Sequence, residues 1–171
     1  MNGIYVPTRC TSSLVSTSHH ASTREVLMPT LLRTTTLPAD PDQIWSVIKG
    51  FDELASWHPR VPPSEMEENA DPTTPGAVRR FIVDGNVVAR EELIEHDDRG
   101  RTYSYEVLDQ PLPVDNYIAR IEVVPAPDGC EVRWTATYDG ADDIIPVVEN
   151  AFGDNVYLVG LDALRDRFDR R

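Results

Sequence analysis

The stretch ADDIIPVVENAFGDNVYLVGLDALRDRFDRR, residues 141–171, decides the fold because it has the pattern of one long helix. No proline follows Pro146, and a proline is tolerated in the first turn, where the N–H groups have no partner. Apolar residues recur mostly every three or four positions, which predicts one apolar face. That face comprises Val148, Phe152, Val156, Val159, Ala163 and Phe168. From Pro146 to Arg171 the helix would be roughly 39 Å long at about 1.5 Å per residue, so it needs a sheet to lie against.

The residues before this helix supply the sheet. Residues 30–37 are β-branched and partly alternating, which predicts a first strand. Two short helices are expected next: residues 39–49, capped by Asp40 with Pro41 in the first turn, and residues 51–57. Six segments with a period of two then follow, at residues 64–69, 77–83, 87–95, 101–108, 116–124 and 131–138. Because strands in hairpin succession form an antiparallel meander, we predict an α+β fold. In it, a curved seven-stranded antiparallel sheet wraps around the long helix and leaves a cavity between them.

Length and composition exclude several classes of protein. At 171 residues the chain is expected to form one domain. Its net charge of −13 argues against nucleic acids and anionic membranes as partners. No apolar run approaches the ~20 residues of a membrane span, so stable membrane insertion is not expected. The two cysteines offer no disulfide framework and indicate a reducing compartment, so we expect the cytoplasm. The histidines lack metal-ligand spacing and no phosphate-binding loop occurs, so we expect neither metal nor cofactor.

Residues 1–27 differ in composition from the rest of the chain. They are rich in serine and threonine and contain one acidic residue, Glu25. They lack the continuous apolar region of a secretory signal. Met28 then opens a stretch that has the pattern of a domain start. We therefore expect a disordered N-terminal extension at residues 1–27 and a ligand-binding domain at residues 28–171.

The order of these elements resembles a known family. The resemblance rests on ADPDQIWSVIKGFDELASWHP (39–59), REELIEHDDRGRTYSYEVLD (90–109), QPLPVDNY (110–117) and the closing helix, and it covers residues 31–171. Together these segments resemble the START-related helix-grip superfamily, also known as SRPBCC. Within it the chain is most similar to bacterial proteins of the polyketide cyclase/dehydrase or lipid-transport type, and it is also similar to the plant abscisic acid receptors. The resemblance implies the helix-grip fold and a pocket for a hydrophobic small molecule.

The resemblance also implies positions that line this pocket. His58 lies where the receptors have a ligand-facing lysine, and Glu91 where they have a pocket glutamate on the fourth strand. Tyr105 and Tyr117 match aromatic or tyrosine positions of that pocket. Phe152 and Val156 match pocket-facing positions on the long helix. The candidate ligand-binding residues are His58, Glu91, Tyr103, Tyr105, Tyr117, Trp134, Phe152 and Val156. The receptors' gate loop is replaced by a short turn at residues 84–86 and their latch by QPLPV (110–114), so hormone sensing with phosphatase binding is not expected.

The residues alone leave alternatives open at each of these positions. His58 is also compatible with a surface histidine that ends a helix. Glu91 shares strand parity with Ala89 and Leu93 and should point inward, where a carboxylate is costly unless it is paired. It is equally compatible with a structural ion pair to Arg79 or Arg101, or with Glu92 being the inward residue. The tyrosines and Trp134 are compatible with plain core packing.

Three functions agree with these features. The first is binding or carriage of a hydrophobic small molecule, such as a lipid, polyketide or isoprenoid, without catalysis. The second is a cyclase or dehydratase in which His58 or Glu91 removes a proton next to a carbonyl while tyrosines stabilise the enolate. The third is a protein-interaction module with an unoccupied pocket, and a homodimer also stays open. Because no spaced set of nucleophile, base and orienting residue is present, we favour the first.

We predict that residues 1–27 are dispensable for folding. A chain starting at Met28 should lose less than about 2 kcal/mol of unfolding free energy, since a larger loss would be a substantial part of a domain's total stability. Thermal unfolding of the full chain and the shortened chain measures this difference. A larger loss would mean that the segment packs against the domain.

Overall fold

The computed structural model describes residues 28–109 and 112–169. The extension expected at residues 1–27 lies outside the described residues, as do Gln110, Pro111, Arg170 and Arg171. The chain begins with strand β1 (Thr30–Leu37), followed by helix α1 (Pro41–Ile48), the 3-10 turn η1 (Phe51–Glu53) and helix α2 (Leu54–Trp57). Both short helices thus occur after the first strand, and Asp40 caps α1 through a bond from the Asp42 N–H at 2.8 Å.

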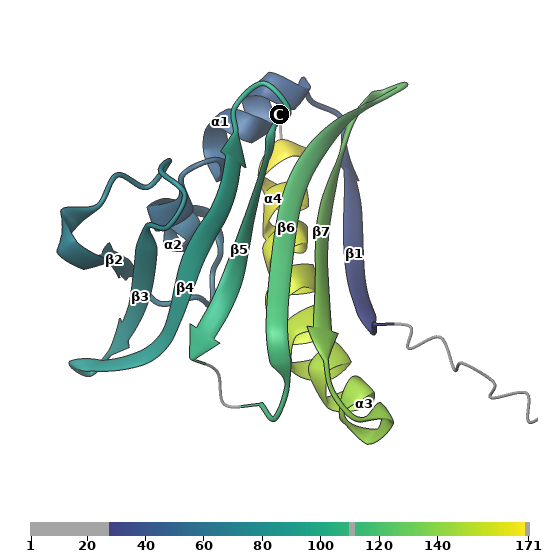
Figure 1. Ribbon diagram of the computed structural model, residues 1–171. Coiled ribbons are helices and arrows are strands. Elements are labelled where there is room, and N and C mark those ends of the chain that lie inside the picture. The colour runs from purple at the N-terminus through teal and green to yellow at the C-terminus, as the bar shows by residue number, and fades with distance from the viewer. Residues whose placement is uncertain (1–27, 110–111, 170–171) are drawn as a thin grey trace, which may run out of the picture.

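Six further strands complete one sheet. They are β2 (Ser64–Met66), β3 (Val78–Val83), β4 (Asn86–Asp97), β5 (Thr102–Asp109), β6 (Asp115–Ala126) and β7 (Gly129–Asp139). The strand order is β1-β7-β6-β5-β4-β3-β2, and each neighbouring pair is antiparallel. Figure 1 shows the sheet curving around the C-terminal helix, which passes behind β5, β6 and β7 in this view. The predicted α+β helix-grip fold with seven antiparallel strands is confirmed.

One strand is shorter than predicted. The predicted strand at residues 64–69 ends at Met66, and residues Glu67–Asn69 form the 3-10 turn η2 instead. Glu68 and Asn69 have φ values of 55° and 52°, so they leave the extended region that a strand requires. The ends of the other strands differ from the predicted ones by one or two residues at most.

The C-terminal helix is not a uniform α-helix. It consists of η3 (Asp142–Ile144), α3 (Ile145–Val148), the π-helical segment η4 (Glu149–Leu158) and α4 (Val159–Asp169). In η4 each N–H bonds the carbonyl five residues back, so its turns are wider than those assumed in the sequence analysis. The predicted apolar face is therefore only partly correct. Val148 and Phe168 are buried as predicted, whereas Phe152 and Val156 are half-buried. Tyr157, Leu161 and Leu164, which lie outside the predicted face, are also buried.

The π segment is attached to the edge strand β1 by an ion-pair cluster. Arg33 of β1 donates from Nη2 to Glu149 Oε2 and to Asp154 Oδ1, both at 2.7 Å. Gly153 lies between these two acids, and a Cβ there would come within 2.9 Å of Leu31 Cδ1. The backbone of η4 therefore sits directly on β1, and the rest of the segment extends over the neighbouring strands.

Gly129 closes the hairpin between β6 and β7 and is also close to β1. Its φ of +141° suits glycine alone, and a Cβ there would lie 2.1 Å from the Leu37 carbonyl oxygen. We predict that Gly129→Ala costs more than about 3 kcal/mol, because strain of about 1–3 kcal/mol is joined by a clash with backbone. Gly85→Ala is the matched control, since Gly85 has a φ of +78° and no atom within 4 Å of an added Cβ. Chemical denaturation measures both, and equal losses would show that the contact with Leu37 adds nothing.

Candidate functional site

An apolar cavity lies between the sheet and the C-terminal helix. It has a volume of about 160 Å³. It is lined by Leu54, Val61, Pro62, Phe81, Val88, Ala89, Glu91, Tyr105, Val107, Tyr117, Trp134, Phe152, Val156 and Tyr157. Val88 is 49% exposed, so the cavity opens to solvent beside the hairpin of β3 and β4. Six of the eight predicted site residues lie in this lining; the two others, His58 and Tyr103, do not.

The strands bring these residues together by simple alternation. Glu91, Tyr105, Tyr117 and Trp134 come from four consecutive strands, β4 to β7, and all lie on the face that the helix covers. Phe152 adds a lid from the π segment, with its ring 4.7 Å from that of Tyr117. The site is therefore assembled from one face of the sheet and one helical segment, and its residues do not form a single sequence motif.

Glu91 is paired with a buried arginine on the neighbouring strand. Arg79 and Glu91 are direct cross-strand partners on β3 and β4. Arg79 Nε donates to Glu91 Oε2 at 2.6 Å, and Nη2 lies 2.5 Å from the same oxygen. Burial raises the pKa of the Glu91 carboxyl, and the Arg79 charge opposes that rise. The structural alternative considered for Glu91 is thus confirmed for Arg79, while Arg101 pairs with Asp42 instead.

Aromatic side chains enclose the Arg79 guanidinium. It lies 4.1 Å from the Phe51 ring centroid, 5.1 Å from that of Phe81 and 4.9 Å from that of Tyr105. Nη1 donates to the Phe51 carbonyl oxygen, which ties the turn η1 to the sheet. Arg79 is fully buried, and such a cation is held by ring faces and by its carboxylate partner. The sequence indicates Arg79 only as a possible partner of Glu91, because strand parity does not reveal which aromatic rings surround it.

Three tyrosine hydroxyls are the other polar groups of the cavity wall. Trp134 Nε1 donates to the Tyr105 hydroxyl at 3.1 Å, and the hydroxyls of Tyr117 and Tyr157 are 2.8 Å apart. Trp134 stacks on Tyr157 with ring centroids 4.3 Å apart. Burial raises the pKa of Tyr105, Tyr117 and Tyr157, so all three stay protonated at neutral pH. The cavity wall therefore carries hydroxyl donors.

His58 anchors the helix instead of facing the cavity. Its Nδ1 accepts the N–H groups of Arg60 at 3.2 Å and Val61 at 3.1 Å. The ring proton therefore sits on Nε2, which donates to the Val156 carbonyl oxygen at 2.8 Å. The expectation that His58 stands across the cavity from Glu91 is not met, because both ring nitrogens bond the backbone. Residue spacing predicts where α2 ends but not which way the side chain at its end turns.

Tyr103 also lies apart from the cavity. It is fully buried between the sheet and α1, against Trp45 and Phe51, and its ring is stacked on His96 with an interplanar angle of 4°. Strand parity alone cannot separate Tyr103 from Tyr105, since both point to the same face. The ring centroid of Phe51 lies 6.0 Å from that of Tyr103 and 6.0 Å from that of Tyr105, so Phe51 packs between the two tyrosines.

Among the lining residues that were not predicted from the sequence, Tyr157 is the one with a polar group in its side chain. The predicted face ran through Phe152 and Val156, whereas Tyr157 is buried with Leu161, Leu164 and Phe168. These four residues follow one another at intervals of four, three and four positions, which is itself a helical spacing. A second apolar face was therefore present in the sequence, and the wide turns of η4 allow both faces to meet the sheet side.

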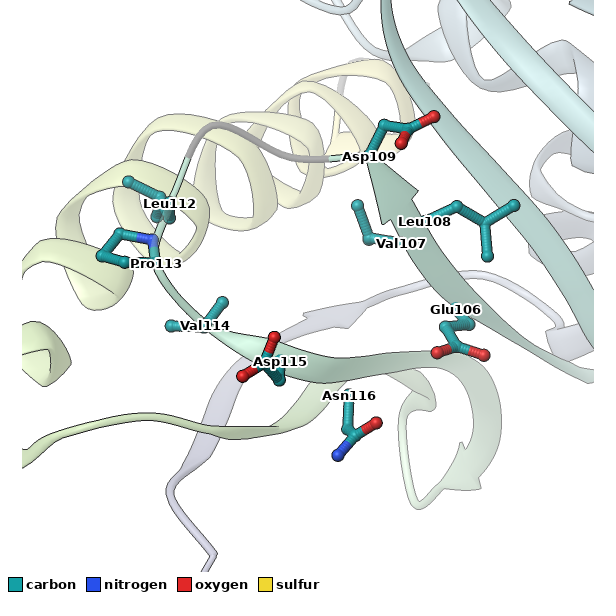
Figure 2. A pocket seen from close by; sticks show the side chains of 9 residues that line it. All are labelled: Glu106, Val107, Leu108, Asp109, Leu112, Pro113, Val114, Asp115 and Asn116. Carbon is teal, nitrogen blue, oxygen red and sulfur yellow. The ribbon is translucent and has the colours of Figure 1, made fainter.

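A second hollow lies where β5 ends and β6 begins. Figure 2 shows its lining, which includes the carboxylates of Glu106, Asp109 and Asp115 and the amide of Asn116. It has a volume of about 690 Å³, and it shares only Val107 with the apolar cavity. Its polar side chains make it a poor match for a hydrophobic ligand.

Neither a metal centre nor a membrane span is found in the part of the chain that the structure describes. Within residues 28–109 and 112–169, no three or more histidine, cysteine, aspartate or glutamate side chains are grouped so that they could hold a metal ion. Among these same residues, no helix is long and apolar enough to cross a membrane.

Comparison with known proteins identifies the family. A family profile described as polyketide cyclase/dehydrase and lipid transport matches residues 28–169. The chain belongs to this family. The resemblance to the START-related helix-grip superfamily is thereby confirmed. No curated protein matches the sequence.

Solved structures of similar proteins have the same fold. An NMR structure from Thermobifida fusca is 36% identical with a TM-score of 0.76, and the match covers 82% of this chain and 93% of that one. XoxI from Bacillus cereus is 28% identical with a TM-score of 0.71, covering 82% and 96%. Norcoclaurine synthase from Thalictrum flavum, in complex with dopamine and hydroxybenzaldehyde, is 18% identical with a TM-score of 0.65, covering 85% and 88%.

In this family member, His58 should make stability depend on pH. Burial lowers the pKa of His58 below its ordinary value of about 6.5. Below that pH the unfolded chain takes up a proton that the folded chain does not, so stability falls with falling pH until the folded pKa is reached. We predict that His58→Leu removes this part of the pH dependence and costs about 1–3 kcal/mol at pH 8, because an acceptor for two N–H groups is lost. Denaturation curves from pH 8 to pH 5 measure both effects, and parallel pH profiles for the two proteins would contradict the assignment.

Proposed function

We propose that the protein binds a small, largely apolar molecule in the cavity between the sheet and the C-terminal helix. One observation carries this proposal: the cavity is lined almost entirely by apolar and aromatic side chains, with one carboxylate and three tyrosine hydroxyls as its polar groups. An apolar wall with a few placed polar groups is the usual composition of a small-molecule site. Membership in a family described by both cyclase/dehydrase activity and lipid transport agrees with a ligand-binding role in general terms.

The size of the cavity limits what fits inside it. Its volume of about 160 Å³ is close to that of engineered apolar cavities of about 150 Å³ that bind benzene. It is smaller than the roughly 300–1,000 Å³ of sites that enclose drug-sized ligands. We therefore propose a ligand, or a ligand end, of about one ring. A lipid, polyketide or isoprenoid would extend past Val88 into solvent or would require η4 to move outward. The complex of norcoclaurine synthase with dopamine and hydroxybenzaldehyde agrees with aromatic ligands in this fold.

The geometry favours binding over proton abstraction. A cyclase or dehydratase of the kind considered above needs a base with a lone pair directed at the substrate. Both nitrogens of His58 are bonded to backbone groups, and the charge of Arg79 opposes the rise in the pKa of Glu91 that would make its carboxylate a stronger base. These two residues were the catalytic candidates, and their bonds support a binder as the first choice.

Benzene uptake tests the proposal directly. We expect benzene to shift the ¹³C-methyl NMR signals of Val107 and Val156, which line the cavity. Ala89→Phe should weaken binding tenfold or more, because the new ring occupies the cavity beside Glu91. Ala141→Phe serves as the matched control, since Ala141 is exposed and outside the lining.

Two results would count against the proposal. The wild-type protein could show no shifts up to the solubility limit of benzene, in which case the cavity takes up no apolar molecule. Alternatively, Ala89→Phe could bind benzene as well as Ala141→Phe does, in which case the benzene site lies elsewhere.

A further inference from the structure

We propose that the Arg79–Glu91 pair makes the cavity select neutral molecules that carry a hydrogen-bond donor, such as a phenol or an alcohol, over cations and anions of the same size. This inference rests on the proposed function, since it concerns the ligand of that same cavity. It assigns Arg79, which does not line the cavity, the role of a positioning residue. Arg79 cannot move away, Glu91 keeps one oxygen unused, and the pair leaves no net charge for a ligand to balance.

Arg79 is fixed in place and stays charged. Its side chain is completely buried, with its guanidinium 4.1 Å from the Phe51 ring centroid and 4.9 Å from that of Tyr105. Nη1 donates to the Phe51 carbonyl oxygen. A guanidinium does not lose its proton in proteins. The positive charge beside Glu91 is therefore permanent. Arg79 cannot turn away from Glu91 toward another carboxylate unless the packing between η1 and the sheet opens.

Glu91 uses one oxygen for Arg79 and keeps the other. Nε and Nη2 of Arg79 both approach Oε2, at 2.6 Å and 2.5 Å. Within residues 28–109 and 112–169, no hydrogen bond is made to Oε1. The Glu91 side chain is 13% exposed and lines the cavity. Oε1 is therefore a charge-assisted acceptor for a donor group on the ligand, and such bonds are roughly twice as strong as neutral ones.

The charge of the pair decides between ligands. Glu91 is the one charged residue in the described lining, and Arg79 already balances it. A cationic ligand would add an unbalanced positive charge to an apolar cavity that already adjoins Arg79. An anionic ligand would meet the like charge of Glu91 after losing its hydration. A neutral hydroxyl donates to Oε1 and adds no charge, so it is the group that this end of the cavity suits.

A matched ligand series tests the inference on the wild-type protein at pH 7. The probes are benzene, phenol, benzyl alcohol, benzylammonium and benzoate, with dissociation constants from NMR titration. Phenol should bind about tenfold more tightly than benzene, which corresponds to about 1.4 kcal/mol. Benzyl alcohol should bind at least tenfold more tightly than either benzylammonium or benzoate, which have nearly the same size.

A double variant tests whether the ion pair causes the order. Arg79→Met with Glu91→Leu removes both charges at similar volume, so no unpaired buried charge remains. In this variant benzene should still bind, and phenol should lose its tenfold advantage over benzene because the charged acceptor of Glu91 is gone. Arg80→Met with Glu65→Leu is the control. It removes an exposed ion pair of 3.1 Å on the adjacent strands β3 and β2, and the wild-type order should persist.

The outcomes separate this inference from the proposed function. If no probe binds, the proposed function fails. If benzene binds but phenol binds no more tightly, or benzylammonium exceeds benzyl alcohol, the inference is overturned and the proposed function stands. If the double variant keeps the wild-type order, Glu91 is not the acceptor. Should the double variant fail to fold, the wild-type series still decides, because the predicted order of affinities needs no substitution.

Discussion

The buried guanidinium of Arg79 is the constraint on which this end of the structure depends. Removing such an ion from water costs several kcal/mol unless it is paired and bonded. The chain meets this requirement with Glu91 on the next strand, the carbonyl oxygen of Phe51 and ring faces from three elements. As a result, η1 is held against β3, and Glu91 is held at the wall of the cavity. The polar end of the cavity is thus a consequence of how one cation is accommodated in the core.

The wall of the cavity that the C-terminal helix forms depends on how this helix is attached to the rest of the fold. Arg33 holds η4 to β1 through Glu149 and Asp154, and His58 holds the carbonyl of Val156 from the other side. Both attachments involve the π-helical segment, whose turns are wider than those of an α-helix. Because the segment is fixed at these points, Phe152 and Val156 cover the cavity without filling it. π-helical turns occur frequently at functional sites, which agrees with the position of this one over the cavity.

Much of the fold could be predicted from the sequence because it is carried by local patterns. Alternation predicted the strands, hairpin turns predicted their antiparallel order, and Asp40 with Pro41 predicted the start of α1. Strand parity also predicted that Glu91 points inward. The π segment could not be predicted, since a change from four-residue to five-residue hydrogen bonding leaves the residue types unchanged. The directions of His58 and Tyr103 depend on tertiary packing against Gly160 and Phe51, which no spacing along the chain records.

The Arg79–Glu91 pair is hard to explain by stability alone. Replacing a buried ion pair by apolar residues of similar volume is often neutral or stabilising, so a sheet of this kind does not require one to fold. Phe51, Phe81 and Tyr105 already surround the site with apolar ring surface. An apolar replacement would remove two things: the oxygen of Glu91 that is free to bind a ligand, and the charge of Arg79 that balances the Glu91 carboxylate. The simplest physical reason for the pair is therefore that it gives a largely apolar cavity one charged acceptor, without giving the cavity a net charge.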